Sequence, residues 1–355
     1  MKKIYTCGFI LLFSFLLFAC EKESSNSTIE SPTPGVETPS PVVNSTPTII
    51  SLPSTPEPTP DSSPTVTPSP TATPSPTPVV EPVVGARSNA PYCLTPTADG
   101  IIVYSSTVST IDASNSSQGY VIANYYGAAG KVKFRITGTD GVVYTYDLHG
   151  GNEVFPLSAG SGSYDLAIYE NVSDDQYSTA QFETISVSLT NTFGPFLYPN
   201  QYVIFNSSST SVAKAKELAK MADTDLDVVS SIYNYIISNI TYDYSKASSV
   251  QSGYLPNPDS TLAAKTGICL DYASLMVAML RSQHIPARLE VGYVGDAYHA
   301  WISTYIKDVG WINGIIQFDG QSWKLMDPTF AASTPGEDLE NFIGNGSSYL
   351  TKYIY

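Results

Sequence analysis

Short runs that alternate between apolar and polar residues occupy residues 89–195 and predict antiparallel strands. In residues 131–136 every second residue is apolar, and Asp140-Gly141 then offers a hairpin turn. The same period of two returns at residues 164–168 and 185–189. About 100 residues of short strands with frequent turns are typical of an immunoglobulin-like β-sandwich. No cluster of catalytic residues is visible in it, so we interpret it as a spacer or a binding module.

The apolar period changes to three and four after the predicted sandwich, which indicates helices. Ser211 is expected to cap the first helix. Thr224 and Asp227 form a capping-box pattern at the start of a second helix, whose apolar residues recur at helical spacing over residues 225–240. A pair of helices is therefore expected to open a C-terminal domain of residues 196–355.

A further helix is predicted to begin at or just before Cys269. Its buried face would consist of Tyr272, Met276, Met279 and Leu280. At a helix N-terminus, unpaired N–H groups and the positive end of the macrodipole stabilise a thiolate, which is the nucleophilic form of cysteine. A lone cysteine is more often a buried structural residue. Cys269 alone therefore leaves both interpretations open.

Two later predicted strands carry a histidine and a carboxylate that could act together with Cys269. Residues 298–305 read as a strand that carries His299, and a later strand ends at Asp327. If these two strands are antiparallel neighbours, Asp327 can orient the imidazole while the other ring nitrogen faces the thiol. Cys269, His299 and Asp327 would then supply a nucleophile, a base and an orienting carboxylate.

The order of these motifs resembles the transglutaminase-like superfamily, which is related to papain-type cysteine proteases. Over residues 225–330 the matching motifs are Gly267-Ile-Cys-Leu-Asp-Tyr-Ala273, Ile285-Pro-Ala-Arg288, Gly292-Tyr293, His299-Ala-Trp301 and Trp323 followed by Asp327-Pro-Thr329. The resemblance implies an α+β fold in which a helix carries the cysteine and an antiparallel sheet carries His299 and Asp327. It also implies that Cys269 is the nucleophile, His299 the general acid and base, and Asp327 its orienting partner.

Residues close to these motifs have two interpretations each. The main-chain N–H of Cys269 is one expected oxyanion donor, and Tyr242 is either the second donor or a core aromatic. Trp301 either lines the substrate cleft or packs beside it. Asp271 is expected to complement the helix dipole rather than to act as the base. Arg288 is expected to form a structural ion pair or to clamp carbonyl groups.

The N-terminus predicts a bacterial lipoprotein. Lys2 and Lys3 precede a short apolar run, and Leu17-Phe-Ala-Cys20 resembles a lipobox. The run is too short for a permanent membrane span, so residues 1–20 are expected to be a signal peptide ending at Cys20. Acylation of Cys20 by two or three chains would anchor the protein to the membrane at the cell surface. An ordinary cleaved signal is the alternative.

Residues 21–88 are rich in Pro, Thr and Ser and are expected to form a disordered stalk. Of the 26 prolines in the 355-residue chain, 16 lie between residues 32 and 82. At about 3.1 Å per residue in polyproline II, such a segment could hold a domain roughly 200 Å from the membrane.

Composition and charge exclude several classes of protein. The formal net charge is −15, and charged residues make up only 14% of the chain. Binding to nucleic acid is not expected, because phosphate recognition needs a basic face and the Lys/Arg cluster at residues 131–135 is small. The four cysteines and three histidines lie too far apart for a disulfide framework or a zinc ribbon. We expect neither a metal nor another cofactor.

Two functions are compatible with these features. The first is an extracytoplasmic, membrane-anchored cysteine enzyme, in which the Cys269 thiolate attacks an amide and His299 protonates the leaving amine. The resulting thioester would pass to water or to a second amine, so transglutamination, deamidation and proteolysis all stay open. The substrate would be a protein or a peptide, including a cell-wall peptide. The second is a surface-displayed binding module for protein or cell wall with a vestigial site.

Overall fold

The computed structural model describes residues 84–313, 316–318, 323–325 and 349–355. The chain divides into the units Met1–Pro76 and Thr77–Tyr355, and every described helix and strand belongs to the second unit. The expected signal peptide, Cys20, nearly all of the expected stalk and Asp327 lie outside the described residues. The domain boundaries expected from the sequence stay predictions.

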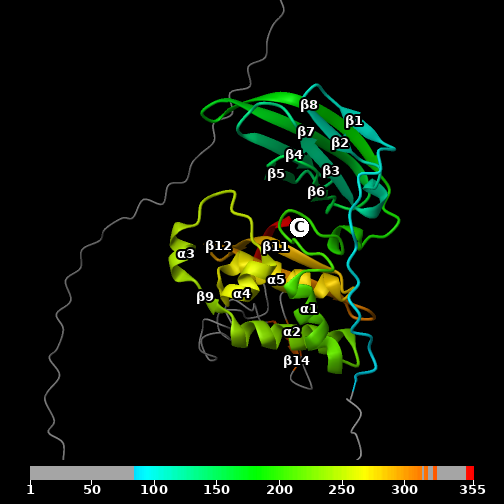
Figure 1. Ribbon diagram of the computed structural model, residues 1–355, viewed down its shortest axis with the longest axis vertical. Helices are drawn as coiled ribbons and strands as arrows, with labels where there is room; N and C mark the ends of the chain where they lie inside the picture. The colour runs from blue at the N-terminus through cyan, green and yellow to red at the C-terminus, as the bar shows by residue number, and fades with distance from the viewer. Residues whose placement is uncertain (1–83, 314–315, 319–322, 326–348) are drawn as a thin grey trace, which may run out of the picture. The chain divides into compact units, whose positions relative to one another are not determined.

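The first half of the described chain forms two four-stranded antiparallel sheets (Figure 1). Their strands are β1 (Val103–Ser105), β2 (Ser109–Asp112), β3 (Tyr120–Tyr125), β4 (Val132–Thr137), β5 (Val143–Asp147), β6 (Glu153–Pro156), β7 (Gly162–Ser173) and β8 (Gln176–Val187). The strand order is β1-β2-β3-β6 in one sheet and β5-β4-β7-β8 in the other. Residues 116–118, before β3, form a 3-10 helix, η1.

The alternating pattern of residues 131–136 is confirmed in β4, where every second side chain is buried. The predicted hairpin at Asp140-Gly141 is also confirmed, because it joins β4 to its antiparallel partner β5. Gly141 has a φ of 77°, which glycine adopts without a steric penalty. The rings of Phe134 and Phe155, one from each sheet, lie 4.8 Å apart in a shared hydrophobic core. The immunoglobulin-like assignment itself stays a prediction.

Helices dominate the next part of the described chain. They are α1 (Thr210–Leu218), α2 (Asp225–Asn239), α3 (Tyr244–Ser249), α4 (Pro258–Ala264) and α5 (Cys269–Ser282), with 3-10 turns η2 (Gly194–Phe196) and η3 (Ala219–Met221). The capping box at α2 is confirmed, since Thr224 accepts from the Asp227 N–H and Asp227 accepts from the Thr224 N–H.

The expected cap of the first helix is wrong. Ser209 occupies the N-cap of α1, and Ser211 lies inside the first turn. Ser211 is fully buried, and its hydroxyl donates to the Asp259 carboxylate at 2.6 Å. Asp259, which belongs to α4, also accepts from the main-chain N–H groups of Thr210 and Ser211. A carboxylate from a distant helix therefore satisfies the groups that a local serine was expected to cap.

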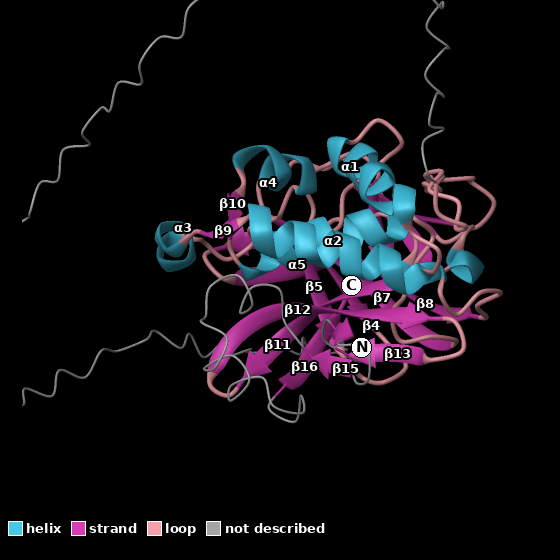
Figure 2. Ribbon diagram, turned by 90° about the horizontal axis from the view of Figure 1, so that it is seen from below, coloured by secondary structure: helices cyan, strands magenta, loops and turns pink. Residues whose placement is uncertain are grey.

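The remaining strands form one four-stranded sheet and two short pairs. They are β9 (Thr241–Tyr242), β10 (Thr266–Gly267), β11 (Ala287–Val294), β12 (Ala297–Ile306), β13 (Gly310–Asn313), β14 (Ile316–Phe318), β15 (Trp323–Leu325) and β16 (Tyr349–Ile354). The antiparallel sheet has the order β13-β12-β11-β16, while β9 pairs with β10 and β14 with β15. Figure 2 shows α1, α2, α4 and α5 on one side of this sheet.

Helix α5 is more deeply buried than its sequence pattern indicated. The predicted face of Tyr272, Met276, Met279 and Leu280 is buried, but so is every other residue from Asp271 to Ser282. The helix contacts β11 and β12 and also α1, α2 and α4. Because it is packed on several sides, it lacks the exposed face of an ordinary amphipathic helix.

Arg281 of α5 forms hydrogen bonds to three other segments of the chain. Its guanidinium is fully buried and donates to the carbonyl groups of Ala287, Tyr198 and Tyr355, at 3.0, 2.6 and 2.8 Å. Burial lowers the pKa of Arg281 to about 9. These bonds connect α5 with the start of β11, with the segment after η2 and with the residue that follows β16.

Candidate active site

Cys269 is the first residue of α5, as predicted. Its neighbour Ile268 occupies the N-cap with an extended backbone (φ −96°, ψ 176°). The thiol is free and partly buried. At this position the N–H groups and the dipole of α5 favour negative charge on the sulfur.

The short parallel pair of β9 and β10 fixes the chain that enters α5. Gly267 lies opposite Tyr242, and the Asp243 N–H donates to the Gly267 carbonyl at 2.9 Å. A Cβ atom on Gly267 would lie 2.6 Å from the Cβ of Asp271, so glycine is needed for this close approach. Tyr242 therefore lies beside the strand that leads to the nucleophile, with its ring 4.9 Å from that of Tyr244.

Asp271 is completely buried in the first turn of α5. Its carboxylate accepts from the Ile268 N–H at 2.9 Å, from the Lys246 ammonium at 2.6 Å and from the Tyr254 hydroxyl at 2.6 Å. The expectation that Asp271 complements the helix dipole fits the first of these bonds. Lys246 and Tyr254 were missed by the sequence reasoning, because no local pattern links them to a residue so far along the chain.

His299 lies in the first half of β12 and is 7% exposed. It pairs with Gly292 of β11, where a Cβ atom would lie 2.0 Å from the Leu350 carbonyl oxygen of β16. The glycine therefore permits three strands to approach closely beside His299. The imidazole stacks on Trp301, with ring centroids 6.3 Å apart and planes inclined by 22°.

Trp301 is packed rather than open to solvent. It is 2% exposed, and its ring meets that of Tyr349 edge-on at 5.0 Å. Across the sheet it pairs with Glu290, whose buried carboxylate accepts from the hydroxyls of Ser303 and Thr351. The surroundings of Trp301 thus resemble a packed wall more than an exposed cleft lining.

Tyr298 is the residue before His299 on β12. Although Tyr298 keeps 59% of its surface exposed, partial burial raises its pKa to about 12, with further contributions from Tyr353, Tyr202, Tyr293 and Cys269. The helix that carries Cys269, α5, contacts β12, the strand that carries His299.

The pairing expected between the strands of His299 and Asp327 stays a prediction, because only Trp323–Leu325 of the later strand is described. β15 pairs with β14, whereas the strands hydrogen-bonded to β12 are β11 and β13. The hairpin to β13 occupies the edge of β12 from Ser303 to Ile306, because Asp308 and Gly310 adopt left-handed backbones that turn the chain back. Asp327 itself lies outside the described residues.

Among the described residues, Arg288 forms neither the expected ion pair nor a carbonyl clamp. Its guanidinium lies over the ring of Trp311 at 3.6 Å and over Phe196 at 4.7 Å, and its buried Nε has no hydrogen-bond partner among the described residues. Burial lowers the pKa of Arg288, while the charge of Glu290 raises it. Arg288 is therefore held by aromatic faces.

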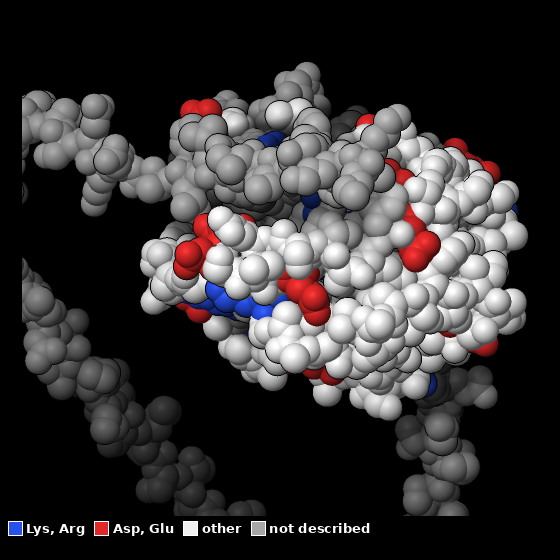
Figure 3. Space-filling view, turned by 90° about the horizontal axis from the view of Figure 1, so that it is seen from above, with Lys and Arg blue, Asp and Glu red and all other residues white. Residues whose placement is uncertain are grey.

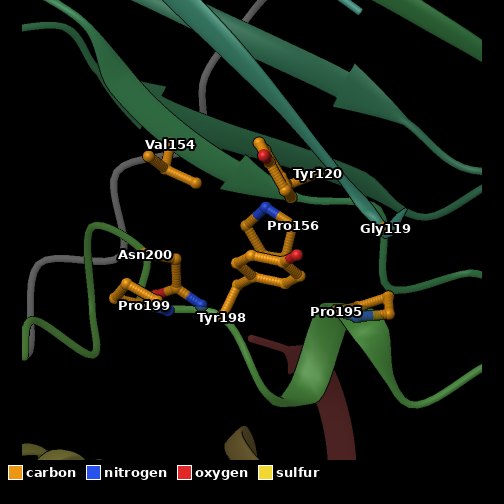
Figure 4. Close-up of a pocket in the computed structure, with 8 residues that line it drawn as sticks. All are labelled: Gly119, Tyr120, Val154, Pro156, Pro195, Tyr198, Pro199 and Asn200. Atoms are coloured by element: carbon orange, nitrogen blue, oxygen red, sulfur yellow. The ribbon is translucent and has the colours of Figure 1, made fainter. Parts of the chain in front are cut away.

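Two further features of the described surface bear on where a site could lie. On the face shown in Figure 3, uncharged residues cover most of the described surface, and basic side chains lie close to acidic ones. A crevice lies where residues 195–200 run past β3 and β6 (Figure 4). It holds no space for a water molecule, so it is a packing defect rather than a substrate pocket.

The described ranges contain neither a cluster of metal-ligating residues nor a helix suited to span a membrane. Within these ranges, no group of three or more His, Cys, Asp or Glu residues could hold a metal ion. No helix among the same residues is both long enough and apolar enough to span a membrane.

The family assignment rests on residues 212–314, which match the model of the transglutaminase-like superfamily. This segment is similar to that superfamily. It contains Cys269 and His299 and ends before Asp327. The match supports the broad class of cysteine enzymes and leaves the specific activity open.

Known proteins show more distant similarity. UPF0252 protein MJ1282 of Methanocaldococcus jannaschii is 28% identical over 123 residues, which are 31% of this chain and 34% of that protein. A crystal structure described as a candidate cysteine protease of Cytophaga hutchinsonii is 18% identical, with a TM-score of 0.31, over 59% of this chain and 66% of that one. Red sea bream transglutaminase is 13% identical, with a TM-score of 0.24, over 65% and 49%. The chain therefore spans about a third of its curated relative.

Proposed function

We propose that this protein is an extracytoplasmic cysteine enzyme that acts on amide bonds of proteins or peptides through a thioester. The observation that carries the proposal is the place of Cys269 at the first position of α5 in a transglutaminase-like domain. Helix α5 packs against β12, the strand that carries His299. A thiol at a helix N-terminus next to a histidine strand has the parts of an activated nucleophile.

In the proposed reaction the Cys269 thiolate attacks the amide carbonyl. The main-chain N–H of Cys269, with Tyr242 as the candidate second donor, stabilises the oxyanion. His299 protonates the departing amine, which leaves a thioester on Cys269, and then activates the water or amine that releases the acyl group. Asp327 holds the imidazole in the required tautomer. No step of this reaction requires a cofactor.

The test offers one glutamine-containing peptide to the full-length protein together with a fluorescent primary amine. Amine incorporation, ammonia release and peptide cleavage are measured in the same reaction. Turnover in any channel is expected, and Cys269→Ser should abolish it. Cys93→Ser is the matched control and should retain it, since Cys93 is the other free cysteine of the described chain. Turnover that survives Cys269→Ser would overturn the proposal.

We also propose that the enzyme is anchored to the membrane through a lipidated Cys20 and held away from it by residues 21–88. The two sheets would then be an immunoglobulin-like spacer. Fractionation of cells that express the full chain tests the anchor. The wild type should sediment with membranes, and Cys20→Ser should release or mislocalise it. Cys7→Ser, in the same signal region, should leave it in the membrane fraction.

The alternative function, a surface-displayed binding module with a vestigial site, makes a different prediction. It requires Cys269 to react like an ordinary thiol and the peptide assay to show no turnover. Binding of peptide without conversion would favour it.

A further inference from the structure

A partly buried ion pair involves the first turn of α5, two residues after the proposed nucleophile. The carboxylate of Asp271 is fully buried, while the Lys246 side chain that pairs with it keeps 31% of its surface exposed. Tyr254 closes the group, because its hydroxyl donates to Asp271 and accepts from Lys246 at 2.7 Å. We call Lys246, Tyr254 and Asp271 the α5 latch.

Helix capping alone does not explain the α5 latch. A carboxylate at the third helical position commonly caps the turn while exposed to water, where it needs no cation. Asp271 caps Ile268 but has lost its water, and a buried unpaired carboxylate is strongly unfavourable. The ammonium of Lys246 therefore supplies the compensating positive charge, which the main-chain hydrogen bond does not provide. Although partial burial lowers the pKa of Lys246, its bonds to Asp271 and Tyr254 raise it above the ordinary value.

The negative charge of Asp271 also matters to the thiol. Asp271 follows Cys269 by two residues in the same first turn, so its charge opposes a thiolate at short range in a region of low dielectric. The dipole of α5 acts in the other direction. Lys246 pairs with Asp271 and so opposes the effect of that negative charge on the sulfur.

Other titratable groups surround the same turn. They are Tyr242 on β9, Tyr254 after α3, and Tyr298 and His299 on β12. The tyrosines are neutral near pH 7. Asp243 caps α3 by accepting from the Lys246 N–H at 2.8 Å, which fixes the helix that carries the ammonium. Lys246 is thus the cation bonded to this carboxylate.

Resting on the proposed role of Cys269 as the nucleophile, we propose that Lys246 and Asp271 are positioning residues for it. Asp271 fixes the backbone from Ile268 into Cys269, and Lys246 cancels the charge of Asp271, so that the helix N-terminus still favours the thiolate. The segment from α3 to Tyr254 therefore helps to position the active site and does more than connect α2 with α4.

The test follows the rate of alkylation of Cys269 by iodoacetamide as a function of pH. Full-length protein is used, and the peptide that contains Cys269 is quantified by mass spectrometry. Lys246→Gln leaves Asp271 uncompensated and should move the midpoint upward by about one pH unit. Asp271→Asn leaves an unopposed ammonium and should move it downward. Lys246→Arg should restore the wild-type midpoint within a few tenths of a unit.

Two controls separate charge from packing. Tyr254→Phe removes a hydroxyl but no charge and should shift the midpoint by less than a few tenths of a unit. The profile of Cys93 should be the same in every variant. Near-ultraviolet circular dichroism checks that each variant is folded. If Asp271→Asn does not fold, the comparison of Lys246→Gln with Lys246→Arg still tests whether the charge at residue 246 sets the midpoint.

A purely structural latch predicts that Lys246→Gln and Asp271→Asn shift the midpoint in the same direction or not at all. Either result would overturn the inference. An equal shift in Lys246→Gln and Lys246→Arg would also overturn it, because arginine keeps the charge. Failure of the proposed function looks different. In that case wild-type Cys269 titrates like Cys93 and no turnover occurs, whatever the variants do.

Discussion

The two-sheet region and the helix–sheet region around Cys269 differ in what they bury. In the sheets the largest buried side chains are apolar or tyrosine, such as Phe134. Asp112, a buried acidic residue of this region, is 8% exposed and bonds to main-chain N–H groups of nearby residues. In the helix–sheet region, Asp271 and Arg281 are both completely buried.

This difference indicates that the helix–sheet region buries charged groups, at a cost in stability, in order to fix the positions of particular segments. A buried charge is expensive, and an apolar replacement of similar volume often gives an equally stable protein. Asp271 orders the turn that begins with Cys269, and Arg281 holds the other end of the same helix. The charged groups of the helix–sheet region thus fix both ends of α5. The sheets need no such device, since alternation alone builds their core.

The largest effect expected from this comparison concerns histidines. His299→Ala should lower turnover by about three orders of magnitude or more, because it removes the proposed general acid and base. The matched variant in the sheets is His149→Ala, whose ring is exposed and pairs with Glu153. It should leave kcat/KM unchanged. Steady-state kinetics on a peptide amide measures both. Equal losses in the two variants would remove the functional contrast between the regions.

The His299 prediction extends to its proposed partner. Triad members act as a unit, so His299→Ala with Asp327→Ala should be little slower than His299→Ala alone. Additive losses would show that Asp327 acts elsewhere.

A second contrast concerns stability. Arg281→Met leaves three buried carbonyl groups without their donor, and should lower the free energy of unfolding by about 3 kcal/mol. Arg135→Met, in β4, loses a cation–π contact with Tyr169 at 5.5 Å and should cost less than about 1 kcal/mol. Urea unfolding followed by far-ultraviolet circular dichroism compares the two. A similar cost for both variants would contradict the assigned role of Arg281.

Local signals in the sequence predicted the elements that carry the site. The alternation in β4, the capping box of α2 and the start of α5 at Cys269 each depend on residues within one turn or one hairpin. The motif of Gly267, Cys269 and Asp271 likewise lies within five residues, and the structure shows that the glycine makes room for the aspartate. Short-range patterns of this kind are visible without a structure.

Long-range partners could not be predicted from the sequence. Lys246 and Asp271 are 25 residues apart, and Tyr198 and Arg281 are 83 apart. Nothing in the local pattern distinguishes Lys246 from a solvated lysine. The hairpin that places β13 beside β12 likewise depends on a turn at Asp308 that resembles many other turns. Tertiary packing decides such contacts.

The smallest expected effect concerns the N-terminus of α1, whose cap was assigned to Ser211 from the sequence. The hydrogen bonds from Ser211 and Thr210 outweigh burial, which acts in the opposite direction, and lower the pKa of Asp259 below its ordinary value. A carboxylate of this kind stabilises the fold above its unfolded pKa of about 3.9, and the contribution disappears as pH falls through the lower folded value. Asp259→Asn should therefore cost about 1 kcal/mol at neutral pH.

The pH dependence makes this last test specific to the ionised cap. The difference in unfolding free energy between wild type and Asp259→Asn should shrink as the pH falls below about 4. Asp165→Asn is the matched variant in the sheets, where a half-buried side chain accepts a hydrogen bond from the Thr184 hydroxyl at 2.7 Å. It should cost less than about 0.5 kcal/mol at any pH. An Asp259→Asn difference that persists unchanged near pH 3 would mean that the side chain acts through packing, since protonation would then have removed nothing.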